Sequence, residues 1–112
     1  MPQSMPDEFL SACGGAEPYA LQVTDTSMEP EFPRHCIIII EPVGAVKSGA
    51  YAIVDFDGMP WFRQYVERED GAYLVALNDL YPEIRLEGNW RVTGVIVQRN
   101  VRRKIKHYHP LV

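Results

Sequence analysis

Ser27 and Arg63 are the residues of this 112-residue chain whose types and positions bear most directly on chemistry. Ser27 lies in the segment Asp25-Thr26-Ser27-Met28-Glu29-Pro30, just after an apolar run from Tyr19 to Val23. A junction between a strand and a turn is a common way to present a nucleophilic hydroxyl at a surface. Arg63 lies in a second strand-like run, Trp61-Phe62-Arg63-Gln64-Tyr65, where an arginine is a poor candidate for a base. Whether the chain is an enzyme depends on this pair.

The chemistry of a serine nucleophile requires a base, because the hydroxyl attacks efficiently only when its proton is removed. A buried lysine can serve, since burial lowers the pKa of its amine from about 10.4 toward working pH. An arginine guanidinium has a pKa above about 12 and stays protonated in proteins. Bringing it to neutrality would require over 5 pKa units, or roughly 7 kcal/mol. Arg63 is therefore not a general base.

Other side chains could replace Arg63 as the base, but each has a simpler interpretation. Lys47 falls in a turn, where an exposed lysine is expected, and His35 is expected at a loop tip, pointing away from Ser27. His107 and His109 lie in a basic C-terminal arm and are more simply solvated. Proteolysis by a serine–lysine mechanism is therefore not expected.

Length and composition are those of one globular domain, with 46% apolar and 23% charged residues. The longest strongly apolar run, Ile37 to Ile40, is far shorter than the roughly 20 residues of a membrane span. The N-terminus lacks the pattern of a signal peptide, so Cys13 and Cys36 are expected as free thiols in a reducing cytosol. These features predict a cytoplasmic protein without a membrane partner.

The net charge of −4 conceals a strong asymmetry along the chain. Residues 1–98 hold all fifteen acids and six bases, a balance of −9, whereas residues 99–112 carry +5. The basic tail is interpreted either as a solvated strand or arm, or as a surface that docks on the acidic body of a second copy. Nucleic acid is the least favoured partner, because an acidic body repels phosphates.

From Tyr19 onward the pattern is typical of short strands separated by turns. The predicted strands are Tyr19–Val23, Cys36–Glu41, Ala50–Asp55, Pro60–Glu67, Ala72–Leu77 and Trp90–Gln98. Asp57-Gly58 and Asp70-Gly71 are hairpin signals, which predict a meander of three antiparallel strands. No segment shows a helical apolar stripe over twelve residues, so the chain is expected to be mostly β.

These features, in this order, resemble the peptidase domain of the LexA, UmuD and phage-repressor family over about residues 13–106. Members of that family are regulators that cleave themselves with a serine–lysine dyad, on a β-rich fold shared with signal peptidases. The matching segments are Tyr19–Val23 with Ser27–Pro30 (strand and nucleophile turn), Phe32–Cys36 with Ile37–Ile40 (next turn and strand), Trp61–Tyr65 (the strand that usually carries the lysine), Leu77–Ile84 (an Asn-x-x-Tyr-Pro segment) and Gly94–Val97 (a Gly-Val closing strand).

The resemblance implies a complex of short, strongly bent antiparallel sheets over residues 18–106, with no long helices. Residues 1–17 are expected to form a flexible N-terminal arm, and residues 107–112 a C-terminal tail. Ser27 takes the nucleophile position and Arg63 the position of the dyad lysine. Met28, Asn78 and Tyr81 become candidates for the cleft.

The chain departs from the family pattern in three places. Asp25-Thr26 replaces the Gly-Asp that usually precedes the serine, and Arg34-His35-Cys36 replaces an Asp-Gly-Asp turn. A turn that needs positive φ costs a non-glycine residue about 1 kcal/mol or more, although His tolerates it better than most. The third departure is Arg63, which could donate to Ser27 Oγ and hold the cleft closed. It could instead recognise a carboxylate of an extended peptide bound by strand addition.

Family members cut an Ala-Gly or Cys-Gly bond upstream of the serine, and Ala12-Cys13-Gly14 resembles such a site. At about 3.3–3.6 Å per residue, the few residues between Gly14 and the strand at Tyr19 could hardly fold back to Ser27. A flexible hinge is the simpler interpretation, and delivery to a second copy's cleft is the other. The cysteines and histidines lack the paired short spacings of a zinc site, and no phosphate-binding loop is present, so no metal or cofactor is predicted.

We therefore expect a stand-alone domain with the LexA/UmuD-like serine peptidase fold, catalytically impaired, that acts as a regulatory or interaction module. A homodimer is expected, since the resemblance implies pairing through exposed strand edges, and a peptide or protein is the second expected partner. No helix-turn-helix pattern accompanies the domain, which again argues against nucleic acid. The alternative is an active self-cleaving peptidase of the SOS-response or phage-repressor type, from a bacterium or a phage.

Overall fold

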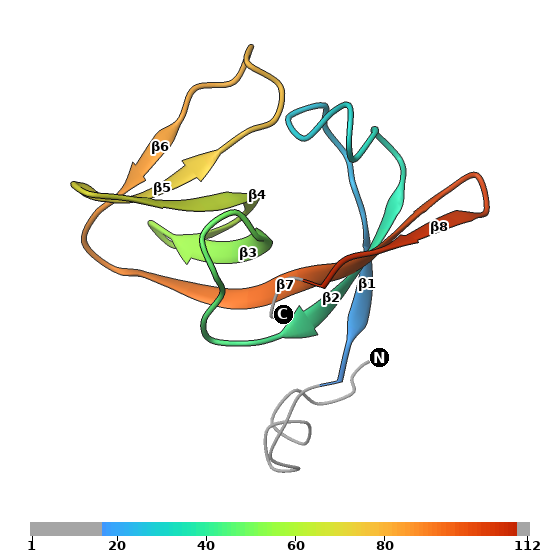
Figure 1. Ribbon diagram of the computed structural model, residues 1–112, viewed down its shortest axis with the longest axis horizontal. Coiled ribbons are helices and arrows are strands. Elements are labelled where there is room, and N and C mark those ends of the chain that lie inside the picture. The colour runs from blue at the N-terminus through green and yellow to red at the C-terminus, as the bar shows by residue number, and fades with distance from the viewer. Residues whose placement is uncertain (1–16, 110–112) are drawn as a thin grey trace.

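The computed structural model describes residues 17–109, which form eight β-strands and no α-helix (Figure 1). The strands are β1 (Tyr19–Gln22), β2 (Ile37–Pro42), β3 (Tyr51–Phe56), β4 (Met59–Arg68), β5 (Gly71–Val75), β6 (Ile84–Leu86), β7 (Trp90–Val101) and β8 (Lys104–His107). Within this range no helix is long and apolar enough to cross a membrane. The predicted mostly-β fold is confirmed.

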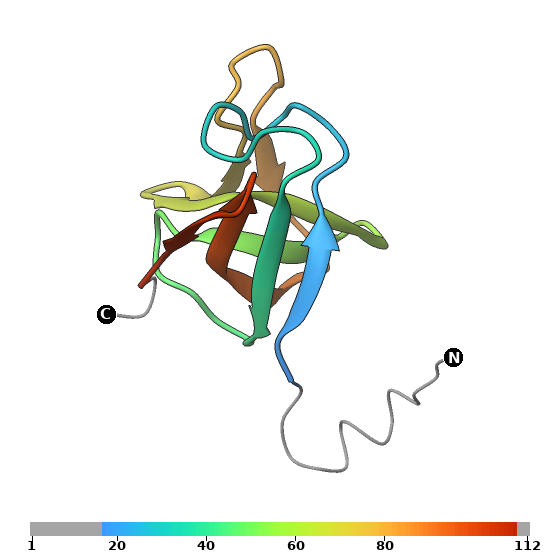
Figure 2. The same ribbon diagram turned by 90° about the vertical axis from the view of Figure 1, so that its right-hand side faces the viewer.

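All eight strands belong to one antiparallel sheet in the order β1-β2-β7-β3-β4-β5-β6, with β8 paired to β7. The 12-residue strand β7 connects the two halves, because it pairs with β2, β3 and β8. Its register slips opposite Ile39/Ile40 and again opposite Ile53/Val54. Such irregularities bend strands, and Figure 2 shows β1 and β2 running across the direction of β3 and β4.

The predicted three-stranded meander is present as β3, β4 and β5. Asp57 and Gly58 both have positive φ, of 57° and 79°, as a two-residue hairpin turn requires. The second hairpin joins β4 to β5 and places Gly71 at the start of β5 with φ of 146°. His35 also has a positive φ, of 77°. It lies in the turn where the family resembled by the sequence usually has a glycine.

The core consists of two apolar clusters on the two sides of the bend. One contains Ile38 and Ile40, alternate residues of β2, together with Met28 and Phe32 from the segment after β1. Met28 and Phe32 are fully buried, and the Phe32 ring lies 4.9 Å from that of Tyr51. The second cluster fills the space beneath the meander with Ala52, Val54, Tyr65, Ala72, Leu74, Leu86 and Val92. The turn that carries Ser27 is therefore anchored in the first cluster.

Two strands were not expected from the sequence, and β7 is three residues longer than expected. β6 has three residues and β8 has four, and every residue of β8 is exposed. Each segment is too short to show a readable alternation of apolar and polar residues. Pairing with a neighbouring strand is what makes each of them a strand. β7 continues to Val101, three residues beyond the predicted end, and there it pairs with β8.

Gly94 on β7 gives a direct test of this packing. A Cβ at Gly94 would lie 2.5 Å from Ile40 Cγ2, and Ile40 is fully buried, so the surrounding core would have to shift. We expect Gly94→Ala to lower the free energy of unfolding by about 1–3 kcal/mol in urea denaturation. Gly44→Ala, where a Cβ would meet nothing within 4 Å, should change it by less than about 0.5 kcal/mol. Equal effects of the two substitutions would contradict the strand packing.

Candidate functional site

The serine turn, residues 25–33, follows β1 and buries the hydroxyl of Ser27. Ser27 exposes 1% of its surface. Its backbone N–H and its Oγ both donate to Asp25 Oδ1, at 3.0 and 2.8 Å. An aspartate that accepts the N–H two residues later forms an Asx-turn, which explains why the chain turns here. Asp25, one of the two residues that differ from the family pattern before the serine, therefore begins the turn.

Arg63 reaches the same hydroxyl from β4. Its side chain is buried, and Nη1 donates to Ser27 Oγ at 2.9 Å and to the Phe62 carbonyl oxygen at 2.8 Å. The guanidinium carbon lies over two aromatic rings, 5.3 Å from the centre of Trp61 and 5.7 Å from that of Tyr81. Cation–π contacts of this kind partly replace the water that a buried cation loses. The hydrogen bonds to the Phe62 carbonyl oxygen and to Ser27, together with the contacts with the two rings, fix the position of the guanidinium charge.

The electrostatics of the pair are set by burial and by Asp25. Burial lowers the pKa of Arg63, and the negative charge of the nearby Asp25 carboxylate acts in the opposite direction. The guanidinium remains protonated, since even a buried arginine does not lose its proton near neutral pH. Ser27 Oγ accepts a hydrogen bond from this cation and donates its own proton to Asp25.

Asn78 and Tyr81 hold the serine turn from the loop between β5 and β6, which lies beside it in Figures 1 and 2. The Asn78 backbone N–H donates to the Ser27 carbonyl oxygen at 3.0 Å, and Asn78 Nδ2 donates to the Thr26 carbonyl oxygen at 3.1 Å. The Tyr81 hydroxyl lies 3.1 Å from Thr26 Oγ1. Met28 points into the core instead. Asn78 and Tyr81 thus fix the backbone around Ser27.

The other candidate bases lie on the surface. Lys47, His35, His107 and His109 are all exposed, and none of them forms a hydrogen bond with Ser27 in the part of the chain that the structure describes. Cys13 and Gly14, the possible cleavage-site residues, lie outside the described residues. Across residues 17–109 no group of three or more His, Cys, Asp or Glu side chains gathers as metal ligands do.

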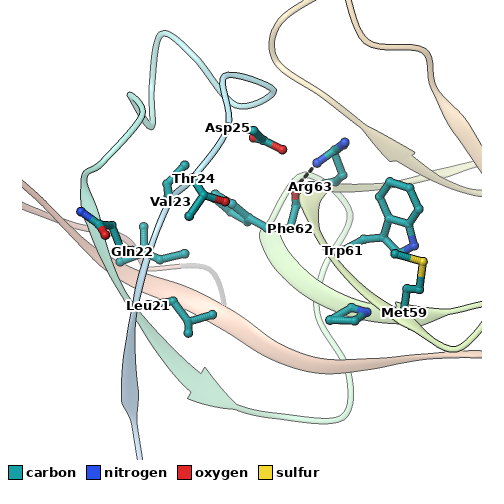
Figure 3. Close-up of a pocket in the computed structure, with 11 residues that line it drawn as sticks. Leu21, Gln22, Val23, Thr24, Asp25, Met59, Trp61, Phe62 and Arg63 are labelled. Atoms are coloured by element: carbon teal, nitrogen blue, oxygen red, sulfur yellow. Dashed lines mark hydrogen bonds between the residues drawn. The ribbon is translucent and has the colours of Figure 1, made fainter.

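A groove of about 290 Å³ opens beside Arg63, between residues 21–25 and the first half of β4. Figure 3 shows the side chains of Leu21, Val23 and Asp25 on one flank and those of Met59, Trp61 and Arg63 on the other. Among the described strands, β1 pairs only with β2, and β4 pairs with β5 only from Gln64 onward. Each flank of the groove therefore has an unpaired backbone edge.

Glu31 ties the serine turn to the C-terminal hairpin, and nothing in the sequence pattern had singled it out. Its Oε2 accepts hydrogen bonds from Lys106 Nζ at 2.7 Å and from the Tyr108 hydroxyl at 2.6 Å. Arg99 Nη1 donates to the Glu31 carbonyl oxygen at 2.6 Å and lies 3.4 Å from Oε2. Two of the five bases in the last fourteen residues therefore contact an acid of the same chain.

Asp25 and Trp61 are two further residues of the site whose roles the sequence analysis did not assign. An aspartate two positions before the serine was a visible signal for an Asx-turn. Trp61 shares a strand face with Arg63, because residues two apart on a strand point to the same side. The contact with the Trp61 ring could have been anticipated from that spacing.

The stability that Glu31 contributes should depend on pH. Burial alone raises the pKa of Glu31, but hydrogen bonds from Lys106 and Tyr108 and the charges of Lys106 and Arg99 outweigh it and lower the pKa below 4.5. A lowered folded-state pKa gives stability that is complete above the unfolded-state value and is lost as pH falls through the folded-state value. Glu31→Gln should therefore cost about 1–2 kcal/mol at pH 7, and this difference should shrink below about pH 4.5.

Chemical denaturation of both proteins between pH 7 and pH 2 measures this difference. Glu69→Gln is the matched control, because Glu69 is exposed and forms no hydrogen bond or salt bridge within residues 17–109. A difference between wild type and Glu31→Gln that stays constant down to pH 2 would contradict the assignment.

Comparison with known proteins places this chain in a family. Residues 4–97 match the family described as Peptidase S24-like. The chain is also 31% identical over 87 residues to the HTH-type transcriptional regulator for conjugative element R391 of Providencia rettgeri. The regulators for conjugative elements SXT of Vibrio cholerae and pMERPH of Shewanella putrefaciens match equally well.

Each of these alignments covers 71% of the chain and 40% of the relative, so the chain spans about two fifths of the length of these regulators. The match to the family covers most of the chain, and it agrees with the antiparallel β fold and with the resemblance found in the sequence. The chain belongs to the Peptidase S24-like family.

Proposed function

We propose that this domain has lost the self-cleavage activity and acts as a dimeric regulatory module that binds other polypeptide segments. The observation that carries the proposal is the 2.9 Å hydrogen bond from Arg63 Nη1 to Ser27 Oγ. A protonated guanidinium donates hydrogen bonds and accepts no proton, so it occupies the place of the base without performing its reaction.

The backbone of the serine turn gives the proposal further support. A peptidase stabilises the tetrahedral oxyanion with free N–H donors near the nucleophile. The N–H of Ser27 is already engaged by Asp25 Oδ1 at 3.0 Å. The arrangement thus uses Ser27 as a structural link between Arg63 and Asp25.

The groove beside Arg63 supports a binding role. An extended peptide can add to unpaired strand edges through main-chain hydrogen bonds, with side-chain pockets supplying specificity. Both flanks of the groove have such edges, and Leu21 and Met59 expose apolar surface there. The relatives are transcriptional regulators of conjugative elements, and we extend a regulatory role to this chain on that similarity.

Exposed edges also support the dimer. β1 and β8 each pair with one strand within residues 17–109, and Tyr19, Leu21 and Ile105 expose large apolar surface on them. The acidic body and the basic final residues supply complementary charges for two copies. Association through an edge would remove the open strand surface that otherwise favours aggregation.

Incubation of the purified full chain at alkaline pH tests the loss of cleavage. We expect intact mass to be retained, because Arg63 stands at the position of the dyad lysine and keeps its proton. Arg63→Lys supplies a base that burial can neutralise, so it should restore slow release of an N-terminal fragment. The double variant Ser27→Ala/Arg63→Lys should remain intact. Fragment release from the wild type that Ser27→Ala abolishes would refute the loss of activity and favour a working autopeptidase.

The mass of the protein in solution tests the dimer. Sedimentation equilibrium at high micromolar concentration should give twice the mass of one chain, with weaker association at high salt because charges are screened. A monomeric mass throughout this range would rule out the dimer while leaving the catalytic proposal untouched.

A further inference from the structure

A second and larger cavity, of about 760 Å³, lies between the end of the serine turn and the β7–β8 hairpin. Four cationic side chains line it, and we call it the basic groove: Arg34, Arg99, Arg102 and Lys104. No acidic residue and no Phe, Tyr or Trp is among the residues that line it. On a chain whose residues 1–98 carry −9, this is a local inversion of charge.

Most of the positive charge in the basic groove is uncompensated. Arg99 is partly neutralised by Glu31 at 3.4 Å. Arg34, Arg102 and Lys104 are exposed and form no salt bridge among residues 17–109. Like charges brought together in a concave site raise the local potential and attract anions. The groove therefore favours a negatively charged ligand.

The β7–β8 turn places its arginines at some conformational cost. Arg102 and Arg103 both have positive φ, of 51° and 70°, in a region that glycine and asparagine enter more readily. The turn is held by the Arg103 N–H, which donates to Asn100 Oδ1 at 3.0 Å. Strained residues of this kind often lie at functional sites. The chain keeps cations at this tip although glycine or asparagine would form the turn more easily.

Apolar surface completes the basic groove. Pro33, Ile37 and Val101 line it between the cations, and Ile37 exposes 36% of its surface. Strand pairing joins the walls, because β2 pairs with β7 at Ile37 and Asn100 and β8 pairs with β7 at the same asparagine. A suitable ligand therefore combines negative charge with apolar side chains.

We propose that the basic groove binds an acidic peptide segment of a partner protein that also carries one or two apolar side chains. The site is separate from the groove beside Arg63 and does not depend on whether Ser27 is active. It shares the basic residues Arg99, Arg102 and Lys104 with the proposed dimer, so the peptide and a second copy would compete for them. Nucleic acid fits less well, because single strands bind through aromatic stacking platforms that the basic groove lacks. A longer nucleic acid would also meet the acidic body of the protein.

Fluorescence anisotropy with a labelled synthetic peptide tests the proposal on the full chain. The probe is a short peptide rich in Glu with two Leu side chains, and its comparator replaces every Glu by Gln. We expect saturable binding of the acidic probe, weaker binding of the comparator by at least about tenfold, and loss of affinity as salt rises from about 50 to 200 mM. Failure of the acidic probe to bind would overturn the proposal.

A pair of double variants locates the site. Arg34→Gln/Lys104→Gln should weaken binding of the acidic probe by about tenfold or more. Arg91→Gln/Lys47→Gln removes the same two charge types from exposed positions elsewhere and should change it by less than about twofold. Arg91 precedes Arg99 by eight residues on β7, a path of about 26 Å along the strand at 3.3 Å per residue.

Two further outcomes decide against the proposal. Equal effects of the two double variants would indicate nonspecific attraction to positive charge. A labelled oligothymidine that binds more tightly than the acidic peptide, and loses affinity in Arg34→Gln/Lys104→Gln, would assign the basic groove to phosphate groups. Circular dichroism of each variant establishes that the fold is retained.

Discussion

The guanidinium of Arg63 carries its charge into the interior of the protein, and its need for hydrogen-bond acceptors joins β4 to the serine turn. A buried cation without partners costs roughly several kcal/mol. Arg63 finds the Phe62 carbonyl oxygen on its own strand and Ser27 Oγ across the groove. The rings of Trp61 and Tyr81 cover the remaining face. On this account the serine is retained as an acceptor for the cation.

The serine turn is held from three directions, and this determines what surrounds it. Asn78 and Tyr81 fix it on one side, Arg63 fixes it from β4, and Glu31 joins it to the C-terminal hairpin. Its beginning forms part of the groove beside Arg63, and its end forms part of the basic groove. A single anchored turn thus separates an apolar, edge-lined surface from a cationic one.

Much of the sheet could be predicted because its longer strands carry local signals. Asp57-Gly58 predicted the first hairpin, since two residues with positive φ make a tight turn favourable. β6 and β8 could not be predicted, because three or four residues give no readable alternation and their partner strands fix them. The approach of Arg63 to Ser27 was expected only through the family resemblance. The contacts of Glu31 with residues 75 and 77 positions later have no local signal at all.

The protonation and bonding of Arg63 provide the most direct measurement of the central claim. Nitrogen-15 NMR of arginine-labelled protein between pH 6 and pH 9 resolves a buried guanidinium through its slowed rotation and protected protons. The account predicts a protonated Arg63 signal that does not titrate in this range and that shifts in Ser27→Ala, because its acceptor is removed. A signal that titrates to the neutral form, or one that Ser27→Ala leaves unchanged, would contradict the account.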